Sequence, residues 1–140
     1  MSTCLVSFVV CDFDYKADLN HRISLRPALI AKNRADNAIG VSPGILGAIA
    51  DFVNVPYSLE KMDQIGIPEG YFSGGMENWG LVIYSEPYLA YGNHLADAIN
   101  KQSAITMISH EFAHQWFGNL VSPLWWSPQA NDCGRIYSLS

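Results

Sequence analysis

The 140-residue sequence has few charged residues and no long apolar run. Charged residues make up 15% of the chain, against about 25% in an average soluble domain. Hydrophobic residues make up 49%, so intrinsic disorder is excluded, because the chain has too much apolar mass and too little charge to stay solvated. A chain of this length forms roughly one domain with a real core. The low charge also indicates that part of its surface is covered by further protein.

Basic residues are scarce and scattered. There are 8 Lys and Arg against 13 Asp and Glu, which gives a net charge of −5. No stripe or cluster could neutralise phosphates, so nucleic acid and lipid headgroups are excluded as partners. No segment reaches the roughly 18 apolar residues of a membrane span. The first residues also lack the positive charge and cleavage site of a secretory signal peptide.

Cysteine is rare as well, and the three cysteines are too few for a disulfide framework. Cys4 and Cys11 lie an odd number of positions apart in a run expected to be one strand, so they point to opposite faces and cannot pair there. Both are expected to be small buried hydrophobes.

Hydrophobic periodicity predicts an α+β protein. The apolar run at 5–13 is typical of a buried strand, and 15–22 is polar enough for a loop. Apolar residues recur at helical spacing over 35–53, although Pro43, Gly44 and Gly47 interrupt them. The other expected elements are short strands at 23–25, 61–67 and 81–84, a glycine-bearing turn at 70–75 and a helix at 100–118.

The expected helix at 100–118 contains the sequence His110-Glu111-Phe112-Ala113-His114. Two histidines at i and i+4 share one helix face and can converge on one metal ion. Glu111 borders that face, where a carboxylate can reach a water molecule without binding the metal. This H-E-x-x-H arrangement is typical of two zinc ligands and a general base. The alternative is that two core histidines fell at this spacing by chance. The opposite face is spaced to pack into a core, through Ile105, Ile108, Phe112 and Trp116.

A second motif, GGMENWG at 74–80, precedes HEFAHQWFGNLVSPLWW at 110–126. The first motif alone could be an ordinary glycine turn. Together they resemble the aminopeptidase N family of zinc peptidases, whose catalytic domains carry a GAMEN-type loop before an HEFAHQWFG-type helix. KMDQIGIP at 61–68 fits the strand before that loop, and MSTCLVSFVVCDF at 1–13 is similar to an internal stretch of the family. The resemblance covers most of the chain.

This resemblance implies a division of the chain and a function. Residues 1–25 would be the end of an N-terminal β domain, and 26–140 the first part of a thermolysin-like catalytic domain. The chain would be a truncated or divergent zinc aminopeptidase, which removes the N-terminal residue of peptides, and the missing segments of the enzyme would be its partners. Alternatives are a catalytically impaired peptide-binding or regulatory relative, or a truncated product without a stable fold. Family members are often membrane-anchored or secreted and some are cytoplasmic, so localisation stays open.

The resemblance also assigns roles to residues. His110 and His114 would hold Zn²⁺, and Glu111 would be the general base that later returns a proton to the leaving amine. The exopeptidase loop would consist of Gly74, Gly75, Met76, Glu77 and Asn78, with Gly75 where alanine is usual. Glu77 would bind the free α-amino group, which fixes cleavage to a chain end.

The third zinc ligand departs from the family pattern. The family has a glutamate 19 positions after the second histidine, and that position is Cys133 here. A slip of one residue would place Asp132 there instead. Thiolate is a competent zinc ligand, so both residues remain candidates. Tyr137 lies too close in sequence to be taken as the family's catalytic tyrosine.

Three other features have simpler interpretations. The pair Trp125-Trp126 is expected to pack beneath the site. Tyr88 and Tyr91 could line a pocket, but such a pair more often packs a surface turn. His21 and His94 are expected to be solvated loop histidines.

Overall fold

The computed structural model describes residues 5–92 and 98–121. In it, one mixed sheet has the strand order β1-β2-β3-β5-β4. β1 (Asp14–Asp18) is antiparallel to β2 (His21–Leu25), whereas β2 is parallel to β3 (Met62–Ile67) and β3 to β5 (Leu81–Ser85). The short strand β4 (Gly75–Met76) pairs antiparallel with β5 at the edge of the sheet. Together with the helices this confirms the predicted α+β class.

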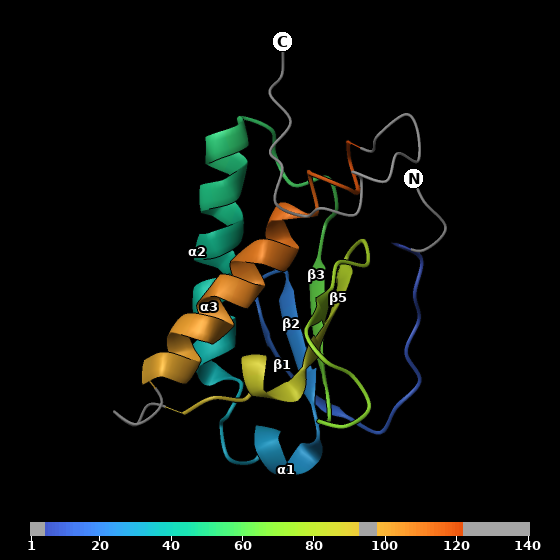
Figure 1. The fold of residues 1–140 in the computed structure, drawn as a ribbon, viewed down its shortest axis with the longest axis vertical. Helices are drawn as coiled ribbons and strands as arrows, with labels where there is room; N and C mark the ends of the chain where they lie inside the picture. The colour runs from blue at the N-terminus through green and yellow to red at the C-terminus, as the bar shows by residue number, and fades with distance from the viewer. Residues whose placement is uncertain (1–4, 93–97, 122–140) are drawn as a thin grey trace.

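Two long helices lie on the same side of the sheet, α2 (Asp36–Val53) and α3 (Ala98–Ala113) (Figure 1). The parallel pair β2 and β3 requires a crossover connection, which α1 (Pro27–Ile30) and α2 supply. The predicted helix at 35–53 and strands at 23–25, 61–67 and 81–84 are confirmed, with α2 continuing through Pro43. A 3-10 helix, η2 (Glu86–Tyr88), follows β5. No helix of the described residues is long and apolar enough to cross a membrane.

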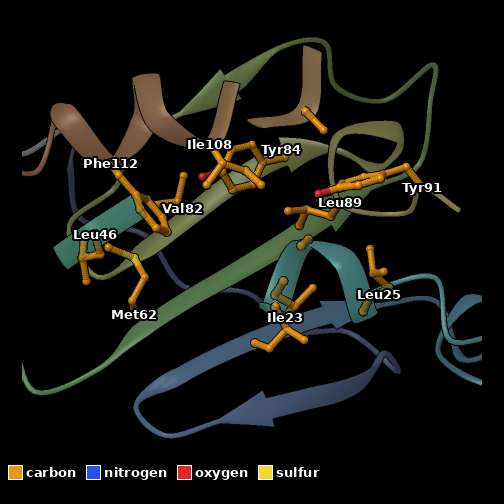
Figure 2. Close-up of a cluster of buried hydrophobic side chains, with 14 of the residues drawn as sticks. Ile23, Leu25, Leu46, Met62, Val82, Tyr84, Leu89, Tyr91, Ile108 and Phe112 are labelled. Atoms are coloured by element: carbon orange, nitrogen blue, oxygen red, sulfur yellow. The ribbon is translucent and has the colours of Figure 1, made fainter. Parts of the chain in front are cut away.

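The hydrophobic core fills the space between the sheet and these two helices (Figure 2). α3 contributes Ile108 and Phe112, and the turn after it contributes Trp116. Each is at most 4% exposed, as the predicted apolar face requires. The sheet and α2 contribute Ile23, Leu25, Leu46, Met62, Val82 and Tyr84. Packing of this face fixes the rotation of α3 about its axis, so the residues between the core positions have defined directions.

The apolar run at 5–13 is not a strand, and the prediction of a buried strand there was wrong. Val6, Phe8 and Val10 are 67%, 87% and 92% exposed. Within the described residues the segment makes a single backbone hydrogen bond, in which the Trp79 N–H donates to the Leu5 carbonyl at 3.2 Å. A strand requires a neighbouring backbone with which it can form hydrogen bonds. Residues 5–92 and 98–121 provide none for residues 6–13.

The predicted loop at 15–22 was also wrong, because β1 and the start of β2 occupy it. Cys11 is exposed as a free thiol rather than buried, and Cys4 lies outside the described residues. β1 and β2 belong to the same sheet as β3 and β5. The domain boundary expected after residue 25 stays a prediction.

His21 is buried on β2, contrary to the expectation of a solvated loop histidine. It is 3% exposed, and its ring centroid lies 6.2 Å from that of Phe112. Alternation along a strand places His21 on the same face as Ile23 and Leu25, which are core residues. Burial lowers the pKa of His21 from its usual 6.5, and the negative charge of Asp18 opposes part of that change.

We expect the stability of the fold to fall in mild acid because of His21. The folded state disfavours the charged imidazole, so the unfolded chain takes up the proton first as the pH falls through about 6.5. Stability is therefore lost from about pH 6.5 down to the lowered pKa of the folded state, with a slope of at most about 1.4 kcal/mol per pH unit. Urea unfolding of the wild type and His21→Leu between pH 8 and 5 measures this loss. An equal loss in both proteins would contradict it.

Candidate metal and peptide site

The two histidines of the H-E-x-x-H sequence lie where α3 ends and the chain turns. α3 ends at Ala113, before the predicted end at 118. The turn that follows uses Gly118 with a φ of +134°, a conformation that favours glycine. It brings the carbonyl oxygen of Phe117 to 3.0 Å from Nδ1 of His114. With the proton on Nδ1, the lone pair of His114 Nε2 is free for a metal ion.

The two imidazole rings converge. His110 Nε2 and His114 Nε2 are 3.1 Å apart, and the rings stand at 89° to each other. Two imidazole nitrogens this close together could both bind one zinc ion at the usual zinc–imidazole distance of about 2.0–2.1 Å. The pair therefore fits one zinc ion. Residues 5–92 and 98–121 contain no group of three or more potential metal ligands, so they offer two.

His110 has a lowered pKa, because burial disfavours its charged form and His114 lies close to it, while Glu77 opposes the effect. A lower pKa favours the neutral imidazole, which is the form that binds metal. His110 is therefore more readily available as a neutral ligand near neutral pH.

Glu111 is the buried carboxyl beside the pair, with only 3% of the residue exposed. Burial raises its pKa from 4.5 to about 7, the charge of Glu77 acts in the same direction, and His114 opposes them. Its Oε2 atom is buried and has no hydrogen-bond partner among the described residues. A carboxyl group with a pKa near neutrality can both accept and return a proton at physiological pH.

The loop at 74–80 is tied directly to the chain after α3. The side-chain amides of Gln115 and Asn119 both donate to the carbonyl oxygen of Glu77, at 3.3 and 2.8 Å. Gln115 Oε1 in turn accepts the N–H of Gly80 at 3.3 Å. Both amides are buried, with Gln115 1% and Asn119 2% exposed. Buried polar groups that are bonded in this way hold two segments in one geometry.

The carboxylate of Glu77 acts on the same group of residues. Its charge helps to raise the pKa of Glu111 and opposes part of the lowering of the pKa of His110. Charges influence one another in this way when they lie close together. The loop at 74–80, the carboxyl of Glu111 and the histidine pair therefore form one cluster. Its members come from β4, the loop that follows β4 and the end of α3.

A cavity of about 600 Å³ lies against this cluster. One end is formed by Gly75, His110 and Glu111, and the cavity continues along α3. The remaining lining residues are Tyr88, Gln102, Ser103, Thr106 and Met107. Tyr88 thus lines a pocket, whereas Tyr91 is 3% exposed and belongs to the core. Most of the lining side chains are uncharged, and they include both polar ones, such as Gln102 and Thr106, and the apolar Met107.

The structure brings together all the predicted site residues that it describes, namely His110, Glu111, His114 and the five loop residues 74–78. Cys133, Asp132, Tyr137, Trp125, Trp126 and His94 lie outside the described residues. The sequence interpretation missed Gln115 and Asn119. A signal for them exists, because Glu111, Gln115 and Asn119 follow one another at intervals of four, which marks a polar stripe beside the apolar face.

The sequence is similar to those of known peptidases. Residues 37–129 match the Peptidase family M1 domain. The chain is 46% identical over 132 residues to aminopeptidase N of Homo sapiens and 42% identical over 131 residues to aminopeptidase Ey of Gallus gallus. It is 39% identical over 130 residues to endoplasmic reticulum aminopeptidase 1 of Mus musculus.

Each of these alignments covers 91% of the present chain. The chain spans only 14%, 13% and 14% of the length of the three relatives. Because the family match extends over most of the chain, this protein belongs to peptidase family M1.

Proposed function

We propose that this chain carries the metal- and amine-binding part of a zinc-dependent aminopeptidase, acting on peptides with a free N-terminus. The observation that carries the proposal is the 3.1 Å separation of His110 Nε2 and His114 Nε2 beside the buried Glu111. The hydrogen bonds from Gln115 and Asn119 to the backbone carbonyl of Glu77 support it, because they hold the residue that would bind the amine beside the histidine pair.

Each residue has a distinct task in this proposal. His110 and His114 would hold the zinc ion, which when bound supplies Lewis acidity and makes a water molecule nucleophilic near neutral pH. Glu111 would accept the proton of the attacking water and pass it to the leaving amine. Glu77 would hold the substrate ammonium by a charge-assisted hydrogen bond, so only the first peptide bond lies beside Glu111.

A catalytic zinc ion normally has three protein ligands. We propose Cys133 or Asp132 as the third, since the family spacing points to this pair. Zinc content per chain, measured after dialysis, is expected to fall in one of the variants Cys133→Ala and Asp132→Ala. If neither variant differs from the wild type, the third ligand lies elsewhere.

Hydrolysis of an aminoacyl-arylamide tests the activity. Release of the arylamine by the zinc-loaded chain, its loss on chelation and its return with added zinc would support the proposal. An N-acetylated version of the same substrate should not be cleaved, since Glu77 would have no ammonium to bind. Zinc binding without turnover would favour the impaired peptide-binding relative. Cleavage that persists through chelation would contradict the proposed mechanism.

A further inference from the structure

An ion pair joins the carboxyl ends of two parallel strands. Arg26 follows β2 and Glu86 follows β5, and β3 lies between these strands in the sheet. The Nε atom of Arg26 donates to Oε2 of Glu86 at 2.7 Å, and its Nη2 atom donates to Oε1 at 2.6 Å. A guanidinium that binds both oxygens of a carboxylate fixes the directions of the two side chains as well as their separation.

The two partners depend on this contact unequally. The backbone of Arg26 is held in an extended conformation, with φ −52° and ψ 140°, because Pro27 follows it. Half of the Arg26 side chain is exposed, so water can hydrate its charge. Glu86 is 7% exposed, and a carboxylate so far from water is stable only when its charge is paired. Without Arg26 this carboxylate could reach water only if its backbone moved.

The backbone of Glu86 begins η2, and this turn carries a residue of the cavity. The N–H groups of Leu89 and Ala90 donate to the Glu86 carbonyl at 3.0 and 2.9 Å. Tyr88 lies inside the turn that these bonds close, and its side chain lines the cavity. The place of Glu86 at the end of β5 therefore sets the place of Tyr88.

We propose that Arg26 and Glu86 are positioning residues, which hold η2 so that Tyr88 forms one wall of the cavity. The other lining residues come from β4 and α3. A peptide in the cavity would contact Tyr88, so a shift of η2 would weaken its binding and leave the chemical step largely intact. This effect on binding rests on the proposed function, whereas the effect on η2 does not.

Hydrogen exchange of the Leu89 and Ala90 amides, followed by NMR, tests the hold on η2 without any turnover. We expect Arg26→Gln to speed their exchange by about 10-fold or more, because the unpaired carboxylate draws the turn toward water. Adding Glu86→Gln to this variant should restore most of the protection, since the buried charge is then gone.

Lys16→Gln is the matched control. It breaks an exposed ion pair with Asp36 that joins β1 to α2, and neither element lines the cavity. It should leave the exchange of both amides unchanged. Unchanged exchange in Arg26→Gln would overturn the proposal, and so would exchange that stays as fast after Glu86→Gln is added. Should Arg26→Gln fail to fold, Arg26→Lys keeps the charge but loses the two-point contact. It should speed the exchange by about 3-fold, and no change there would overturn the proposal.

Kinetics with an aminoacyl-arylamide test the consequence for binding. Arg26→Gln should raise KM by about 5–10-fold and alter kcat by about 2-fold or less. Tyr88→Ala should act similarly, and the double variant should be no worse than either, because both changes affect the same wall. Additive losses, or a fall in kcat at constant KM, would overturn this role. A wild type without turnover would contradict the proposed function, and hydrogen exchange alone would then decide whether the ion pair holds η2.

Discussion

Replacing Glu111 by glutamine is expected to lower kcat/KM for an aminoacyl-arylamide by about 10²–10⁴-fold. Glutamine has the size of glutamate, but it cannot accept the proton of the attacking water. The zinc content per chain should stay the same, because the proposed metal ligands are His110 and His114. Parallel measurements of initial rates and bound zinc therefore separate loss of the base from loss of the metal.

Glu69→Gln is the matched control, since Glu69 is exposed and lies outside the cluster. It should leave both rate and zinc content unaltered. A Glu111→Gln protein that hydrolyses the substrate as fast as the wild type would mean that another group moves the proton. Zinc lost together with activity would mean that Glu111 contributes to metal binding instead.

Replacing Phe112 by alanine is expected to have the largest effect on stability. In the sequence Phe112 lies between the two histidines of the motif. Its side chain is fully buried, and its ring packs in the core beside His21. Truncating a buried phenylalanine destabilises a protein by about 3–5 kcal/mol, a large part of the about 5–15 kcal/mol that a domain of this kind has. Urea denaturation followed by circular dichroism measures the change.

Phe52→Ala makes the same chemical change at a residue of α2 that is 85% exposed. It should alter the free energy of unfolding by about 0.5 kcal/mol or less. If the two variants lose similar amounts, α3 does not depend on its apolar face for its position. The site would then need another explanation for the convergence of its histidines.

The elements that could be predicted from the sequence are those whose apolar side chains pack into the hydrophobic core. α3 and β5 are examples, since Phe112 and Val82 both enter the core. The run at 5–13 has the same composition as a buried strand, but hydrophobicity does not show whether a second backbone lies beside it. For β1 the error is the opposite one, since a strand was predicted as a loop. It is an edge strand whose residues are mostly exposed, so it has no apolar alternation to detect.

For the site, the sequence shows the residues whose chemistry needs a fixed local spacing. The interval between His110 and His114 is such a case, because one turn of helix separates them. The two hydrogen bonds that hold the carbonyl of Glu77 come from residues about forty positions later, and the cavity beside Glu111 is lined by Gly75 from another element. Such relations depend on how β4 and α3 pack. No pattern within either segment contains that information.

The side-chain amides of Gln115 and Asn119 fix the loop at 74–80 directly to the chain that follows α3. The group that would recognise a chain end and the group that would cut beside it are fixed to each other, and not through the chain that joins β5 to α3. Changes in the length or composition of that connection should therefore leave the choice of bond unchanged. Under the proposed function, the position of the cut bond relative to the bound amine would depend on this pair of hydrogen bonds rather than on the length of the covalent connection.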